Sequence, residues 1–196
     1  MLHPCAQIIF DACFPQKYEM SLVDKVKSHI RDVANFPKPG IVFKDITPIF
    51  ADPQLVQEIV AALVNKLRPI RPDSIAAIEA RGFIFGAILA HELKCRFIPI
   101  RKSGKLPYKT RQEEYALEYG TAVVEIHEDA ISPGDRVLVH DDLLATGGTA
   151  TAAGRLVREM GGEVVGFSVI INLGFLPGAE KIAKEFGIEP DYLVRY

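Results

Sequence analysis

Two adjacent acids and the small residues after them form the most chemically informative segment of the chain, residues 137–149. A short apolar run from Val137 to Val139 leads through His140 into Asp141 and Asp142. An apolar run that ends in acids is typical of a buried parallel strand whose carboxyl end opens into a crevice, where ligands of open α/β sheets bind. Because ionised carboxylates only accept hydrogen bonds, the pair suits the neighbouring hydroxyls of a ribose.

The residues after the acids predict an anion-binding turn at the start of a helix. Small side chains would let backbone N–H groups converge on a phosphate, and they belong to Ala145, Thr146, Gly147, Gly148 and Thr149. Apolar residues then recur at helical spacing, so the phosphate would lie at a helix N-terminus. Neither a Walker loop nor a GxGxxG pattern is present. An ordinary strand-to-helix loop is the simpler alternative, but a phosphate cradle beside a diol acceptor predicts a ribose 5-phosphate site.

Cations stand at two further junctions. Arg81 separates an expected strand over 74–80 from an expected helix over 83–93, and its guanidinium suits a bidentate phosphate contact. Three more cations lie at the end of an expected strand over 96–101 or shortly after it: Arg101, Lys102 and Lys105. They suit a mobile loop over an anionic leaving group, with a solvated charge run as the alternative. Residues 108–118 are polar without a clear period, which favours a lid.

The elements that must position these groups alternate between helix and strand. Ser21 is expected to cap a helix with Leu22, Val26, Ile30 and Val33 on one face, and Asp52-Pro53 to begin a helix that reaches Leu67. A strand is expected over 163–173 and a helix over 179–186, and residues 121–126 alternate like a strand. This order predicts an α/β fold, a parallel twisted sheet flanked by helices.

Length and composition narrow the class of protein. The 196 residues suit a single domain over 20–196, and a net charge of −2 gives no field for a nucleic-acid partner. Three widely spaced cysteines favour a reducing, cytoplasmic setting, and no apolar run approaches the ~18 residues of a membrane helix. Residues 1–19 show no signal-peptide pattern; we expect a disordered or non-native extension, with Met20 as the hypothetical natural start.

Beyond these patterns, residues 21–196 closely resemble the adenine phosphoribosyltransferases. The segment 137–149 resembles the phosphoribosyl-pyrophosphate motif that many type I phosphoribosyltransferases share, and four other segments are more specific: residues 36–50, 80–83, 101–107 and 117–120. The resemblance implies the type I phosphoribosyltransferase fold, with a small N-terminal hood at about 36–50 and a flexible catalytic loop at about 102–119. It also implies a homodimer that uses Mg²⁺ to make AMP and pyrophosphate from adenine and phosphoribosyl pyrophosphate.

The same resemblance implies a role for each candidate site residue. Asp141 and Asp142 would hold the ribose hydroxyls, and residues 145–149 the 5-phosphate. Arg81 and Lys102, supported by Lys105, would contact pyrophosphate, while Arg101 would reach the site of the partner subunit. No residue is expected to bind the metal directly, because substrate and water would hold it.

The purine and the proton transfer involve other residues. Val42 and Lys44 of the hood would read adenine through backbone atoms, with Phe43 and Leu173 near the ring. Glu118 would act as the acid/base group at the imidazole edge of the purine, and Tyr119 would close with the loop.

Two positions depart from the family pattern, and two other functions stay open. His140 stands where the family strand usually has an aliphatic residue, and Asn172 precedes Leu173 where many eukaryotic relatives have an acid. A transferase for another purine base is one alternative. A regulator that binds phosphoribosyl pyrophosphate without chemistry is the other; the cationic loop and Glu118 disfavour it.

Overall fold

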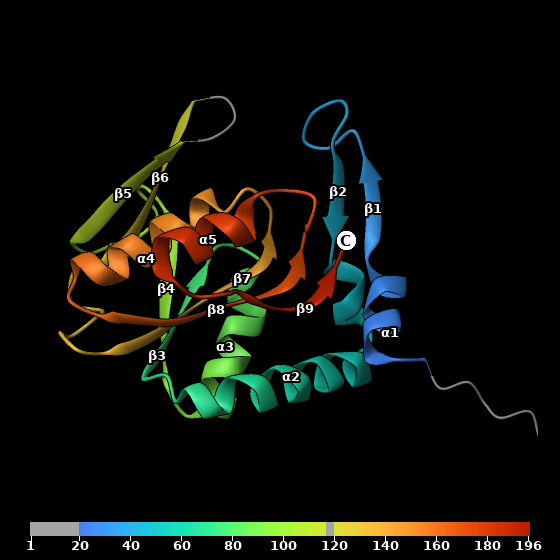
Figure 1. Cartoon of the computed structure of the whole chain (residues 1–196), viewed down its shortest axis with the longest axis horizontal. Coiled ribbons are helices and arrows are strands. Elements are labelled where there is room, and N and C mark those ends of the chain that lie inside the picture. The colour runs from blue at the N-terminus through green and yellow to red at the C-terminus, as the bar shows by residue number, and fades with distance from the viewer. Residues whose placement is uncertain (1–19, 117–119) are drawn as a thin grey trace, which may run out of the picture.

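The computed structural model describes residues 20–116 and 120–196. Figure 1 shows a main sheet with helices packed on it and a separate two-stranded sheet near the start of the described chain. The helices are α1 (Leu22–His29), α2 (Pro53–Leu67), α3 (Gly82–Leu93), α4 (Gly148–Glu159) and α5 (Gly178–Phe186), with short 3-10 helices η1 (Thr47–Ala51) and η2 (Arg68–Ile70). None of these helices is both long and apolar enough to cross a lipid bilayer.

The strands form two sheets. Strands β1 (Arg31–Ala34) and β2 (Val42–Asp45) pair antiparallel beside the main sheet. The main sheet has the order β5-β6-β4-β3-β7-β8-β9. Its strands are β3 (Ser74–Ile78), β4 (Arg96–Lys102), β5 (Thr110–Ala116), β6 (Thr121–His127), β7 (Arg136–Leu144), β8 (Glu163–Asn172) and β9 (Asp191–Arg195).

The expected parallel sheet is present as five of the seven strands. From β4 to β9 every neighbouring pair is parallel, whereas β6 runs antiparallel to β4 and β5 antiparallel to β6. The chain builds outward in one direction from β3 to β4 and in the other from β7 to β9. The order therefore reverses between β3 and β7, and ligands of such sheets bind outside the strand ends at that reversal.

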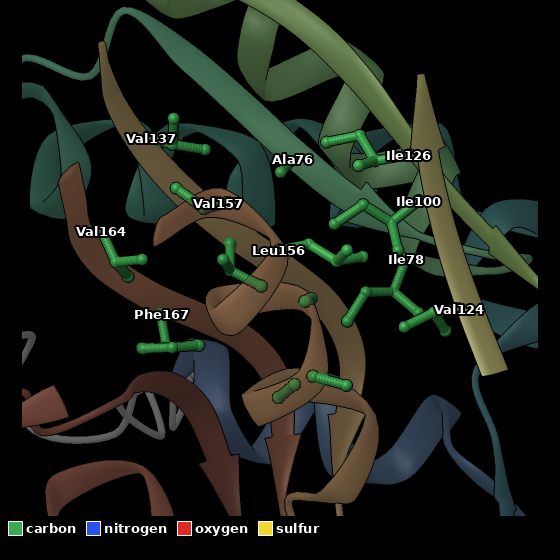
Figure 2. Close-up of a cluster of buried hydrophobic side chains, with 14 of the residues drawn as sticks. Ala76, Ile78, Ile100, Val124, Ile126, Val137, Leu156, Val157, Val164 and Phe167 are labelled. Atoms are coloured by element: carbon green, nitrogen blue, oxygen red, sulfur yellow. The ribbon is translucent and has the colours of Figure 1, made fainter. Parts of the chain in front are cut away.

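Two apolar clusters hold the helices onto the sheet. One joins α4 and α5 to the sheet, and Figure 2 shows Leu156 and Val157 of α4 among side chains such as Ile78, Ile100 and Val124. The other joins α1, α2 and α3 to the opposite face. Burial on both faces explains why β3, most of β8 and the Val137–Val139 part of β7 are apolar in sequence.

Two sequence-based expectations about these elements are wrong. The first helix ends at His29, and Val33 lies in β1, although Ser21 does cap the helix by accepting the N–H of Asp24. The stretch 108–118, expected to lack regular structure, contains β5 from Thr110 to Ala116. A hydrogen-bonded hairpin with β6 supplies the order that its sequence pattern does not show.

Candidate active site

The reversal of strand order brings two of the predicted segments together. Arg81 follows β3 as the N-cap of α3, and Asp142 lies near the carboxyl end of the neighbouring β7. The Arg81 Nε lies 2.8 Å from Asp142 Oδ2. An arginine and an acid that are 61 positions apart in sequence thus form an ion pair at the place where an α/β sheet binds its ligand.

The predicted phosphate turn lies next to this pair. A cavity of about 90 Å³ is lined by Asp141 and residues 143–150, which include the whole predicted turn. Helix α4 begins at Gly148 without a side-chain cap, so the N–H groups of its first turn have no acceptor within the helix. These donors and the positive end of the helix dipole make the cavity suited to an anion.

Close backbone packing explains the glycines around the turn. Gly147 has a φ of +76°, and a Cβ there would come within 2.9 Å of the Gly178 carbonyl oxygen. A Cβ on Gly178 would collide in turn with the carbonyl oxygen of Ala145. Under the aspartates, a Cβ on Gly82 would lie 2.9 Å from Asp141 Oδ1. The start of α5 and the start of α3 therefore both press against the site.

The two aspartates have different electrostatic settings. Burial and the charge of neighbouring Asp142 raise the pKa of Asp141 well above its usual value. Burial also raises the pKa of Asp142, but the Arg81 guanidinium opposes that shift. Asp142 is therefore the carboxylate that keeps its charge more easily, while Asp141 accepts the N–H of Asp142 through Oδ1 at 2.8 Å.

The N-terminal sheet brings an aromatic ring to the same place. The Arg81 guanidinium carbon lies 4.5 Å from the centre of the Phe43 ring, a cation–π contact that connects β2 with the start of α3. The Lys44 ammonium is engaged elsewhere, 2.6 Å from Asp32 Oδ1 and over the Tyr196 ring. Because its side chain is engaged there, only the backbone of Lys44 is available for the predicted contact with adenine. Val42 is half exposed.

Leu173 lies at the same end of the sheet. It follows β8 directly and donates its backbone N–H to the carbonyl oxygen of Leu144 at 3.0 Å, so it lies at the carboxyl end of the sheet beside β7. Its side chain is buried with the α2 and α3 cluster. The structure thus gathers Asp141, Asp142, Arg81, Phe43, Leu173 and the turn at one edge.

The other predicted cations lie at the end of β4. Lys102 is its last residue, and Lys105 is exposed in the turn that leads toward β5. Arg101 is engaged within its own chain, with Nε 2.6 Å from Glu79 Oε2. Glu118 and Tyr119 lie outside the described residues, between β5 and β6, whose ends pair Ala116 with Thr121.

Sequence reasoning missed two residues that support the site. Tyr115 of β5 accepts a hydrogen bond from the Thr149 hydroxyl at 3.2 Å and so ties the hairpin to the phosphate turn. Glu125 of β6 is buried and holds the backbone of the cationic turn. A single acid between Val124 and Ile126 is the sequence signal that could have identified Glu125.

Replacing His140 with valine is expected to weaken the acid dependence of stability. Burial lowers the pKa of His140 from 6.5 to about 4. Between these values His140 is protonated in the unfolded chain but not in the folded chain. The free energy of unfolding therefore falls as the pH drops from 6.5 to about 4. Because one pKa unit corresponds to about 1.4 kcal/mol, this loss of stability reaches about 3 kcal/mol. Denaturant unfolding at pH 7 and pH 4.5 measures it, and identical losses in the variant and the native chain would contradict it.

Comparison with known proteins agrees with this fold and site. Residues 45–190 match the phosphoribosyl transferase domain family, and this match places the chain in the class of the phosphoribosyltransferases. The adenine phosphoribosyltransferase of Cytophaga hutchinsonii is 53% identical over 165 residues, which are 84% of this chain and 91% of the relative. The chain belongs to the adenine phosphoribosyltransferase family.

Solved structures show the same relationship. The adenine phosphoribosyltransferase of Rhodothermus marinus has a TM-score of 0.85 at 46% identity and covers 89% of this chain and 98% of its own. The enzyme of Trypanosoma brucei, solved with AMP, pyrophosphate and ribose-5-phosphate, has a TM-score of 0.81 at 26% identity and covers 91% of this chain and 81% of its own. The type I phosphoribosyltransferase fold expected from sequence is therefore confirmed.

Proposed function

We propose how this chain carries out the adenine phosphoribosyltransferase reaction. The enzyme transfers ribose 5-phosphate from phosphoribosyl pyrophosphate to N9 of adenine, forming AMP and pyrophosphate, a step of purine salvage. One observation carries the assignment of roles: the anion cavity at the start of α4 lies beside the Asp141–Asp142 pair and the Arg81 guanidinium. Phosphate, diol and leaving group thus each have a complementary neighbour.

The sugar phosphate would bind along the end of β7. The N–H groups of residues 145–149 would surround the 5-phosphate, and Asp141 and Asp142 would accept the two ribose hydroxyls. In this arrangement Asp142 exchanges part of its contact with Arg81 for a sugar hydroxyl. The Arg81 guanidinium is then available to the pyrophosphate.

The leaving group would be stabilised by cations. Breaking the C1–O bond leaves an oxocarbenium-like sugar and concentrates negative charge on the departing pyrophosphate. Arg81, Lys102 and Lys105 would stabilise this charge as it develops, and groups fixed in advance do so at little reorganisation cost. Closure of the loop around Tyr119 would keep water from the activated sugar.

Adenine would bind between the N-terminal sheet and the end of β8. Phe43 and Leu173 would contact the two faces of the ring, while backbone groups of Val42 and Lys44 would read its edge. Glu118 would take the proton that adenine loses as N9 becomes a nucleophile.

The residues present fit a Mg²⁺ ion that arrives with the substrate. Mg²⁺ keeps several waters and is usually held by one or two carboxylates together with substrate phosphates. In residues 20–116 and 120–196 no group of three or more His, Cys, Asp or Glu side chains is placed to hold a metal. Asp141 and Asp142 offer two adjacent carboxylates to its waters. When bound, the ion supplies neutralisation of the pyrophosphate charge.

Assembly and location are part of the proposal. We expect a cytoplasmic homodimer in which Arg101 reaches toward the site of the partner subunit. Its pairing with Glu79 within one chain leaves part of the guanidinium for that contact.

Incubation with phosphoribosyl pyrophosphate, Mg²⁺ and one purine at a time tests the function. AMP formation from adenine, with little product from guanine, hypoxanthine or xanthine, is the expected result. Efficient turnover of another purine would assign a different base. Binding of phosphoribosyl pyrophosphate without any nucleotide product would instead identify a regulator.

Replacing Gly147 with alanine is expected to weaken AMP binding about tenfold. The φ of +76° and the nearby Gly178 carbonyl make an alanine in this conformation strained by about 1–2 kcal/mol. We expect the free turn to relieve this strain by moving, so that AMP binding must restore it, and about 1.4 kcal/mol is tenfold in affinity. Calorimetric titration measures the Kd for AMP and, for comparison, the Kd for adenosine, which lacks the phosphate. Gly134→Ala is the matched control, because Gly134 has a φ of +86° with nothing within 4 Å of an added Cβ. Equal losses for both variants would argue against a phosphate role of the turn.

A further inference from the structure

Glu125 is a buried acid to which the reaction scheme above gives no role. It lies on β6 with a relative exposure of 2%, between the core residues Val124 and Ile126. Its register neighbours are Arg101 on β4 and Gln112 on β5. A carboxylate at such a position is costly unless hydrogen bonds compensate it, so its contacts show what it does.

The hydrogen bonds of Glu125 go to the turn between β4 and β5 and to the first residues of β5. Its Oε1 accepts the backbone N–H groups of Lys105 and Leu106, each at 2.9 Å. Its Oε2 accepts from the Thr110 hydroxyl at 3.3 Å and from the Gln112 amide at 3.1 Å. Burial raises the pKa of Glu125, but the backbone N–H donors outweigh burial and leave the pKa below its usual value. The group is therefore an anion at neutral pH.

The other side of the same peptide is held as well. Arg101 donates from Nη1 to the carbonyl oxygen of Lys105 at 3.0 Å, while its Nε pairs with Glu79 at 2.6 Å. The backbone of Lys105 is thus fixed at both its N–H and its C=O, and its side chain stays exposed. Hydrogen bonds to charged groups are roughly twice as strong as neutral ones, so two charged side chains determine where this turn lies.

We propose that Glu125 is a positioning residue that holds the Lys105 turn in place for the pyrophosphate of the substrate. The inference rests on the proposed function, which assigns Lys105 to the leaving group. A lysine side chain is long and flexible, so an anchored backbone reduces the freedom lost when its ammonium meets the phosphate. The buried negative charge also offsets the repulsion among Arg101, Lys102 and Lys105.

Two substitutions separate position from charge. Glu125→Ala removes every contact to the turn. Glu125→Gln can keep all four, because its amide oxygen can accept from Lys105 and Leu106 while its NH₂ faces the Thr110 hydroxyl and a turned Gln112 amide. We expect Glu125→Ala to raise the KM for phosphoribosyl pyrophosphate about tenfold or more, the effect of losing about one strong hydrogen bond. Glu125→Gln should have a KM for phosphoribosyl pyrophosphate close to that of the unmodified chain.

If Glu125 merely stabilised the fold, its loss would also weaken the binding of AMP and of adenine. AMP carries no pyrophosphate, so its Kd should be the same in Glu125→Ala as in the native chain, as should the KM for adenine. Glu128→Ala, an exposed acid just beyond β6, is the control for general effects on the hairpin. A parallel loss of AMP and phosphoribosyl pyrophosphate binding, or no change in either, would overturn the inference.

A double-mutant cycle tests the route through Lys105. If Glu125 acts by placing this lysine, Glu125→Ala together with Lys105→Ala should be little worse than Lys105→Ala alone. Additive increases in the KM for phosphoribosyl pyrophosphate would overturn the inference while the proposed function stands. Failure of the proposed function is seen separately, as absence of AMP formation by the unmodified chain.

Discussion

Replacing Glu118 with alanine is expected to lower kcat by about 10²–10⁴-fold, the usual contribution of a general acid–base group. Adenine becomes nucleophilic at N9 only as it loses a proton, and the proposed carboxylate takes that proton. The proposed sugar-phosphate site is elsewhere, in the cavity at the end of β7, so the Kd for AMP should change far less than kcat. Steady-state rates with adenine, combined with AMP titration, measure both quantities.

The control for this variant lies four residues earlier in the chain. Glu114 is an exposed acid on β5, paired in register with Val123, and Glu114→Ala should leave kcat unchanged. An unchanged kcat in Glu118→Ala would remove Glu118 from the mechanism. Equal losses in both variants would point to damage of the hairpin.

Asp141→Asn is expected to weaken ligand binding and to stabilise the fold at the same time. An asparagine keeps the shape and can still accept the N–H of Asp142 through Oδ1. It lacks the charge proposed to bind a ribose hydroxyl, and a hydrogen bond to a charged group is worth about 1.5–3 kcal/mol. The Kd for AMP should therefore rise about 10- to 100-fold.

The gain in stability follows from the raised pKa of Asp141. An acid that is harder to ionise in the folded chain makes folding less favourable at every pH above its unfolded pKa of 3.8. Asp141→Asn should therefore raise Tm at pH 7, and the gain should disappear as the pH falls below 3.8, where the carboxyl is protonated in both the folded and the unfolded chain. Asp129→Asn, an exposed position, is the control. A lower Tm for Asp141→Asn at pH 7 would contradict the electrostatic argument.

Local patterns identified the elements whose sequence is dictated by burial. The strand–turn–helix unit of β7 and α4 was predicted correctly because an apolar run, small turn residues and a helical period occur one after the other. Strand β5 was missed because it lies at the edge of the sheet, where charged side chains such as Arg111 and Glu114 are exposed and no alternation is required. Its order comes from pairing with β6, which its own residues do not encode.

The end of α1 shows the same limit at shorter range. Leu22, Val26, Ile30 and Val33 have helical spacing, yet the helix ends at His29. Val33 is used by β1, which pairs opposite Phe43 of β2. A partner strand ten residues away thus outweighed a local helical period.

The segment from Val137 to Thr149 by itself predicted a site for a sugar phosphate, because acids and a small-residue turn in that order suit that kind of ligand. Only the tertiary structure decided which residues meet there. Arg81, Phe43 and Asp142 come from three separate elements. Arg81 and Asp142 meet because β3 and β7 are neighbours where the strand order reverses, and Phe43 is brought to them by the separate β1–β2 sheet. The supporting roles of Tyr115 and Glu125 likewise appear only when β5 and β6 pair.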